Sequence, residues 1–226
     1  MRRLTLPAVV FVLVSTLAIA QQQVQPPTQA PPAQQALKLP ASPRGMAATQ
    51  VAGKWVEATT AGAAPRYTDG KWITVDYSRP ILRGRPNIFG SGADYGKKVN
   101  DDGPVWRAGA NQTTRLRTEV PLIIGGKTLP AGEYSLFVDL KPTVWTLVLS
   151  TQPIQQKYDP NNKTETWGSY NYDPKFDVLR APMTLSKGTM SIDQFTIQFL
   201  DIAATGGKLM MAWDKDVATV AFRIGQ

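Results

Sequence analysis

Apolar and polar residues alternate with a period of two along most of the chain beyond about residue 54. The first clear run is 71–78, in which Ile73, Val75 and Tyr77 occupy every second position. Comparable alternation marks 113–120, 134–140, 194–199, 209–213 and 220–224. Successive side chains of a strand point to opposite faces, so each run predicts a strand with one buried face. No window of this length carries the stripe of an amphipathic helix.

Turn signals separate these runs. Gly125-Gly126 predicts a tight turn, and Lys141-Pro142-Thr143 predicts a hairpin between two strands. Segment 144–149 is apolar on both faces, as a central strand is. Gly206-Gly207 and Asp214-Lys215-Asp216 are expected to bound the last three strands, which then form an antiparallel meander.

About nine short strands with turns at this spacing indicate an all-β fold. The expected architecture is an antiparallel β-sandwich, or a jelly-roll-like single domain, over residues 44–226. A closed barrel is the alternative. Two long irregular segments, 79–112 and 152–176, interrupt the strand pattern. Long loops on a β scaffold are where function tends to reside.

The first twenty residues have the pattern of a secretory signal. Arg2 and Arg3 precede an apolar run over 6–17, and Ala18-Ile19-Ala20 is a small-x-small cleavage site. The run is shorter than the roughly 20 apolar residues of a bilayer span, so we expect cleavage near Ala20 and not a transmembrane anchor. No cysteine follows, which argues against a lipid anchor. The predicted location is the periplasm or the exterior, with no membrane span after cleavage.

Residues 21–43 are rich in Gln, Pro and Ala and predict a disordered linker. The 226-residue chain contains no cysteine and no histidine. Ser-His-Asp and Cys-His catalysis, disulfides and thiolate or imidazole metal sites are therefore excluded. Its formal net charge is +8, but the charges are spread. No basic-aromatic stripe for nucleic acid and no phosphate-binding glycine loop is present, and no cofactor is expected.

A series of short blocks follows the strand pattern in a fixed order. They are Val75-Asp76-Tyr77-Ser78-Arg79-Pro80, Arg83-Gly84-Arg85, Ile88-Phe89-Gly90, Val105-Trp106-Arg107-Ala108-Gly109-Ala110-Asn111, the segment 125–137, Trp167-Gly168-Ser169-Tyr170, Tyr172-Asp173, Asp177-Val178-Leu179-Arg180 and Ala212-Trp213. In these blocks, residues 42–224 resemble the exported bacterial domain of unknown function 2911 family. Segments 52–70, 91–104 and 152–166 look longer than in the family. The resemblance implies export and a β-rich body, and it supplies no catalytic residues.

Four loop arginines are the first candidates for a binding site: Arg79, Arg83, Arg85 and Arg107. An arginine holds a carboxylate, phosphate or sulfate with two-point geometry. Arg180 joins this set from segment 167–180. The alternative is structural, with the arginines tied to nearby aspartates, which are Asp76, Asp94, Asp101, Asp102 and Asp177.

Loop aromatics are the second group of candidates. Sugars or flat apolar ligands stack on the aromatic faces that such residues offer, unless the tryptophans close the ends of the sandwich. The group consists of Trp106, Trp167, Tyr170 and Tyr172. Asn111 either bonds a ligand beside Arg107 or adopts a left-handed turn conformation. Asp173 either bonds a ligand or initiates a turn. Trp145 and Trp213 fall within strand patterns and are expected in the core.

Three functions remain open at this point. The first is a non-enzymatic exported module that binds a glycan or small anion through loops 79–112 and 167–180. The second is a structural or protein-interaction module of the cell envelope. The third is a hydrolase that uses paired carboxylates such as Asp173 and Asp177. Calcium at Asp101-Asp102 or 159–162 lacks a loop signature, so no metal site is expected.

Overall fold

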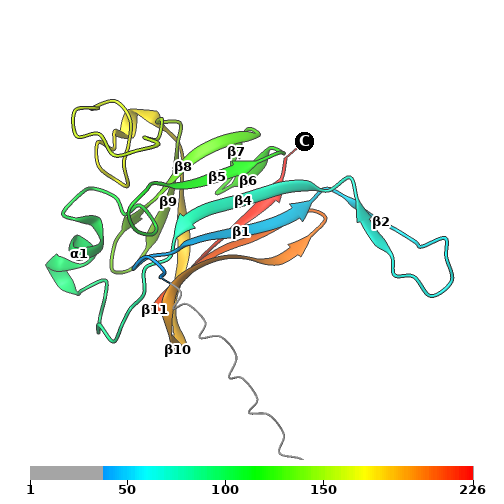
Figure 1. Ribbon diagram of the computed structural model, residues 1–226, viewed down its shortest axis with the longest axis horizontal. Helices are drawn as coiled ribbons and strands as arrows, with labels where there is room; N and C mark the ends of the chain where they lie inside the picture. The colour runs from blue at the N-terminus through cyan, green and yellow to red at the C-terminus, as the bar shows by residue number, and fades with distance from the viewer. Residues whose placement is uncertain (1–37, 226) are drawn as a thin grey trace, which may run out of the picture. The chain divides into compact units, whose positions relative to one another are not determined.

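The computed structural model describes residues 38–225, and nearly all of their regular secondary structure is β (Figure 1). The predicted signal peptide and most of the predicted linker lie outside the described residues. Nine strands form one antiparallel sheet, and two more form a separate hairpin. The all-β prediction is therefore confirmed. The described residues form no barrel.

The sheet consists of two halves that share one long strand. The first half contains, in spatial order, β1 (Arg44–Val51), β4 (Lys71–Ser78), β5 (Thr114–Thr118), β8 (Gly132–Leu140) and β9 (Trp145–Ser150). The second half contains β11 (Gly206–Ile224), β6 (Leu122–Ile124) and β7 (Lys127–Leu129). The shared strand is the 27-residue β10 (Asp177–Ala203), which pairs with β9 over 177–183 and with β11 over 184–203.

The core lies between these halves. Ile73 and Val75 of β4 are fully buried, and so are Phe195 of β10 and Met211 of β11. Burial of such apolar side chains is the main stabilising contribution in a chain without disulfides. The Tyr77 hydroxyl ties the two halves together, because it accepts from the Ile197 amide at 3.0 Å and donates to the Ile197 carbonyl at 3.3 Å.

Several of the predicted strands and turns are confirmed. In β4 the apolar positions are buried, while Trp72 on the other face is 46% exposed. The β8–β9 hairpin turns at 141–143, as predicted. Gly125 and Gly126 link β6 to β7 with φ of 56° and 78°. That left-handed pair matches the twist of a two-residue hairpin, and glycine adopts it without steric cost.

The predicted meander at the C-terminal end is wrong in one respect. Asp214-Lys215-Asp216 is not a turn, because β11 runs through it without interruption. Asp214 has a φ of 51° and lies at a register shift opposite Ile192. Asp216 is buried and pairs with Lys187 at 2.6 Å. Polar residues that usually mark a turn here form a register shift within β11 and an ion pair between β10 and β11.

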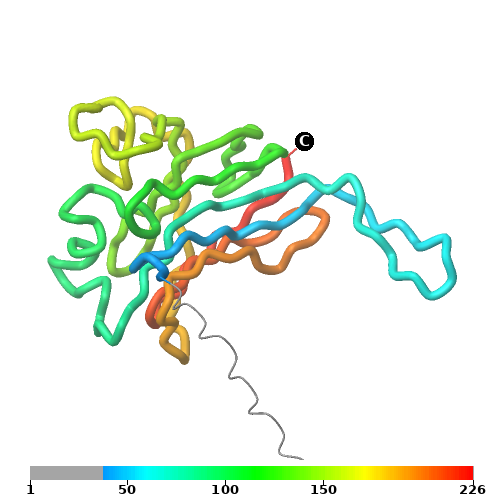
Figure 2. The backbone as a smooth tube through the Cα atoms, in the orientation of Figure 1, coloured from blue at the N-terminus to red at the C-terminus, as the bar shows by residue number. Residues whose placement is uncertain are grey.

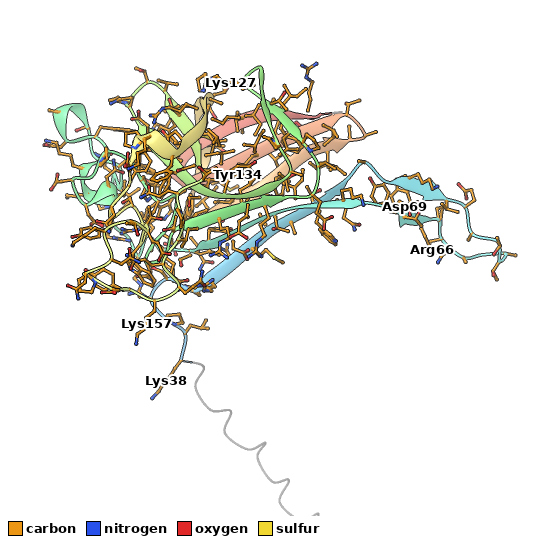
Figure 3. All side chains as sticks on the ribbon, turned by 90° about the horizontal axis from the view of Figure 1, so that it is seen from above. Lys38, Arg66, Asp69, Lys127, Tyr134 and Lys157 are labelled. Carbon is orange, nitrogen blue, oxygen red and sulfur yellow. The ribbon has the colours of Figure 1, made fainter. Side chains whose placement is uncertain are left out.

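Two further strands lie between β1 and β4. β2 (Lys54–Val56) pairs with β3 (Arg66–Thr68), and this hairpin extends from the ends of β1 and β4 (Figure 1). Figure 3 shows Arg66 and Asp69 on the hairpin, away from Tyr134 of β8. Trp55 of β2 is 71% exposed and contacts Tyr67 edge to face. The short helices are η1 (Gly92–Asp94), α1 (Lys97–Asn100) and η2 (Pro174–Phe176).

Candidate anion-binding pocket

A cavity of about 720 Å³ lies where the long β4–β5 loop meets β11. Figure 2 shows this loop at the end of the sheet opposite the β2–β3 hairpin. The volume falls within the range of small-molecule pockets, roughly 300–1,000 Å³. The lining residues that the following argument uses are Arg83, Arg85, Lys98, Trp106, Arg107 and Trp213.

Two tryptophans form the floor of this pocket. The rings of Trp106 and Trp213 are stacked, with 6.2 Å between centroids and 8° between planes. Both side chains are almost fully buried, at 1% and 3% exposure. Their indole N–H groups donate to the carbonyls of Gly109 and Asp193. Trp106 is therefore part of the core and contributes an apolar floor, not an exposed stacking face.

Arg85 is fixed at the rim by the backbone of its own loop. Its Nε donates to the Leu82 carbonyl at 2.9 Å, and its Nη2 donates to the Ile81 carbonyl at 2.8 Å. The guanidinium carbon lies 5.8 Å from the centre of the Trp213 ring, within the range of a cation–π contact. Neutral carbonyls orient this cation without cancelling its charge.

Arg83 reaches the same pocket from a left-handed backbone conformation, with a φ of 52°. Its amide donates to the Asp193 carboxylate at 3.1 Å, which anchors the loop to β10. A non-glycine residue in this region costs on the order of 1–3 kcal/mol, and surrounding contacts must hold it there. Arg83 is exposed, and no ion pair of its side chain is found among the described residues.

Arg107, which follows Trp106 in the chain, also lines the pocket. Its Nη2 donates to Asp101 Oδ2 at 2.9 Å, while its Nε is buried and has no hydrogen-bond partner among the described residues. Gly168 packs behind it, since a Cβ at that position would lie 2.9 Å from Arg107 Cδ. An unsatisfied buried donor is unfavourable and is unusual in a folded protein.

The charges around this pocket are unbalanced. Four cations line it, namely the three arginines and Lys98 of α1, whereas no carboxylate lines it within residues 38–225. A smaller cavity of about 270 Å³ beside Arg115 and Arg117 is different. Asp76 lines that cavity, and Glu133, which lies outside its lining, accepts from the Nε atoms of both arginines, at 2.9 Å and 2.6 Å. This bond to Glu133 raises the pKa of Arg117. Only the larger cavity combines excess positive charge with an apolar floor.

The structure places the other predicted site residues elsewhere. Arg79 donates to the Phe195 carbonyl and to Thr196, so it joins the end of β4 to β10. Asn111 is exposed and has a φ of 59°, which matches the left-handed alternative. Trp167 contacts Tyr158, and Tyr170 lies under Lys163. None of these side chains lines the larger cavity.

The carboxylates of segment 167–180 are each held by a cation. Asp173 pairs with Lys175 at 2.5 Å, and this hydrogen bond lowers the pKa of Asp173. Arg180 donates to Asp177 at 2.9 Å and to Asp139 at 2.8 Å. Burial, followed by the hydrogen bond to Asp177, raises the pKa of Tyr172. This cluster lies outside the larger cavity and offers no acid–base pair free of ion pairing.

Lys98 and Trp213 are pocket residues that sequence reasoning missed. Lys98 lies on the short helix α1 within the β4–β5 loop, and Trp213 has the pattern of an ordinary core residue. The described residues contain no group of three acidic side chains able to hold a metal ion. Within the same range, no helix is long and apolar enough to span a bilayer.

Fold and site together define an all-β domain with a pocket that is lined by four cations and two tryptophans, between the β4–β5 loop and β11. The sequence profile of the family described as "Protein of unknown function (DUF2911)" matches residues 60–222, and the chain belongs to that family. The match covers all of the strands from β3 to β10 and most of β11. No curated protein and no solved structure matches the chain.

Proposed function

We propose that this protein is an exported binding protein that holds a small organic anion in the pocket, without catalysing a reaction. The observation that carries the proposal is the set of four cations without a lining carboxylate around a tryptophan floor. Such a site favours a ligand with a negative group at the rim and an apolar part on the floor. Export rests on the sequence of residues 1–20.

The geometry favours an anion over a neutral glycan. Glycan binding commonly uses aromatic faces that are open to solvent. The rings of Trp106 and Trp213 are buried, and the more open Tyr170 does not line the pocket. Arg83 and Arg85 are exposed at the rim, where their charge attracts anions from solution.

The proposal is tested with benzoate, phenyl phosphate and the neutral analogue benzamide, using isothermal titration calorimetry on the mature protein. The two anions are expected to bind and benzamide is not. Lys98→Ala and Arg85→Ala should each weaken anion binding by about tenfold, since a charged hydrogen bond contributes roughly 1.5 kcal/mol or more. Lys127→Ala removes the same charge from an exposed position on β7 and serves as the matched control.

Two results would contradict the proposal. One is equal binding of benzamide and benzoate, which would mean that charge does not select the ligand. The other is a loss of affinity in Lys127→Ala as large as that in Lys98→Ala. That outcome would mean that net charge acts at a distance and that the pocket has no direct role.

A second candidate is a protein-interaction module of the cell envelope. It is favoured by Trp55, whose side chain is 71% exposed on the β2–β3 hairpin. Exposed tryptophans are energetically expensive in water and are enriched at interfaces. Sedimentation of the wild-type protein and of Trp55→Ser tests self-association. A monomer in both cases counts against this candidate.

A further inference from the structure

Of two neighbouring N–H donors on the Arg107 guanidinium group, only one has an acceptor. Nε and Nη2 are neighbouring donors on one edge of the group, and their parallel N–H bonds match the two oxygens of a carboxylate. Asp101 Oδ2 accepts only from Nη2, at 2.9 Å. Nε is buried without a partner. Of these two neighbouring donors, Nη2 has an acceptor and Nε has none.

The side chain of Arg107 is more buried than that of its ion-pair partner Asp101. Its side chain is 21% exposed, against 68% for Asp101. Gly168, with a φ of 64°, packs against Cδ and Nη1, and a Cβ there would lie 2.9 Å and 3.1 Å from these atoms. This packing covers the opposite edge of the guanidinium. The edge that Gly168 does not cover is the one that carries Nε and Nη2, and Nε itself is buried.

Asp101 is easily displaced. It is the C-cap of α1, with a φ of 51°, and its side chain extends from this turn into solvent. An exposed ion pair with a single hydrogen bond contributes little to stability. Nε of Arg107 is buried in this structure, so a ligand reaches it only when the groups around it move together with Asp101.

We infer that Asp101 is an internal substitute for the carboxylate of the ligand. On binding, the ligand carboxylate accepts from both Nε and Nη2 of Arg107, while Asp101 moves into solvent. The apolar part of the ligand then lies over Trp106 and Trp213. This inference rests on the proposed function and narrows the ligand from small anions in general to carboxylates.

The test compares benzoate with phenyl phosphate for the wild-type protein, Asp101→Asn and Asp102→Asn. Asparagine tolerates left-handed backbone, so both variants keep the turn in which the two aspartates have φ of 51° and 57°. Asp102 is exposed and takes part in none of the ion pairs of Arg107, so it controls for the change in net charge. Asp101→Asn should raise benzoate affinity about threefold to fivefold, as expected when an exposed ion pair no longer competes. Asp102→Asn should raise it less.

Two further measurements identify the atom involved. The Nε–H proton resonance of Arg107 should move downfield on addition of benzoate, because Nε acquires an acceptor. Arg107→Lys keeps the charge but lacks the two parallel donors, and it should remove the gain in affinity produced by Asp101→Asn. Phenyl phosphate should gain less than benzoate from Asp101→Asn.

The outcomes separate this inference from the proposed function. If both anions bind but Asp101→Asn and Asp102→Asn have equal effects, the inference is wrong and the anion pocket stands. The inference is also wrong, and the anion pocket again stands, if benzoate binds without moving the Nε–H resonance of Arg107. If neither anion binds to the wild-type protein or to Asp101→Asn, the proposed function fails and the inference fails with it.

Discussion

The indole rings of Trp106 and Trp213 lie parallel, 6.2 Å apart, although the two residues are on different elements of the fold. Trp106 lies in the β4–β5 loop and forms an isolated antiparallel β-bridge with Val138 of β8, in which both backbone hydrogen bonds are 2.8 Å long. Trp213 belongs to β11, in the other half of the sheet. The pocket floor is therefore part of the core that joins the two halves.

Replacement of Trp106 is expected to act mainly on stability. Trp106→Ala should lower the free energy of unfolding by about 3–5 kcal/mol, because it empties a fully buried site among Phe89, Trp145, Phe195 and Trp213. Trp106→Phe should cost less. Urea denaturation followed by circular dichroism measures both. A loss below about 1 kcal/mol for Trp106→Ala would contradict the core position described above.

Gly168 is expected to control the position of Arg107. In Gly168→Ala the new Cβ meets the Asn111 carbonyl at 2.8 Å and Arg107 Cδ at 2.9 Å, so the guanidinium must shift and benzoate affinity should fall. Gly62→Ala is the control, since Gly62 also has a positive φ, of 80°, but has nothing within 4 Å. Each substitution should cost about 1 kcal/mol or more from backbone strain alone. Equal benzoate affinity in the two variants would show that Gly168 does not position Arg107.

Tyr172 is expected to make stability fall at high pH. Burial, followed by the hydrogen bond to Asp177, raises its pKa above the ordinary value of 10.0. Above about pH 10 the unfolded chain loses this proton while the folded chain keeps it, so the stabilisation present at lower pH is lost as the pH rises further. Urea unfolding at about pH 8 and about pH 10.5 should show this decline.

The matched variant is Tyr172→Phe. It should have a shallower alkaline decline than the wild-type protein, with the remaining slope due to Tyr95 and Tyr134, whose pKa values burial also raises. At neutral pH it should be less stable by about 1–3 kcal/mol, because Asp177 loses a 2.6 Å hydrogen bond. An unchanged alkaline slope would show that Tyr172 titrates normally.

Salt should weaken anion binding. The screening length shortens from about 10 Å at 0.1 M salt to about 3 Å at 1 M, so four rim cations attract a ligand less strongly as salt rises. Benzoate affinity should therefore fall steadily between these concentrations. Affinity that holds constant or increases with salt would indicate that burial on the tryptophan floor alone drives binding.

The sequence allowed the strands to be predicted where alternation and turn chemistry agree. β4, β5 and β8 each bury every second residue of one face, and Gly125-Gly126 has the conformation that its turn requires. Prediction failed at Asp214-Lys215-Asp216, since polarity alone does not distinguish a turn from a bulge. Whether these residues form a turn or a bulge depends on Lys187, which lies opposite Asp216 on the neighbouring strand β10 and pairs with it.

The pocket was predictable only in part. Residue type identified Arg83, Arg85 and Arg107 as candidates, but the same argument included Arg79, which bonds to β10. Which of these four arginines line the pocket depends on the conformation of the loop, and that conformation depends on tertiary contacts. The left-handed backbone at Arg83 is bonded to Asp193, and Arg107 packs against Gly168. Trp213 could not be assigned to a ligand site from a strand pattern that equally predicts the core.

The most direct measurement of the central claim is the indole N–H spectrum, during a benzoate titration, of the chain without the predicted signal segment 1–20. The chain has six tryptophans, so each N–H resonance can be assigned by substitution. Trp106 and Trp213 line the pocket, and their resonances are expected to move with benzoate but not with benzamide. Those of the exposed Trp55 and of Trp167 should stay in place. Movement of Trp167 alone, with Trp106 and Trp213 unchanged, would contradict the account.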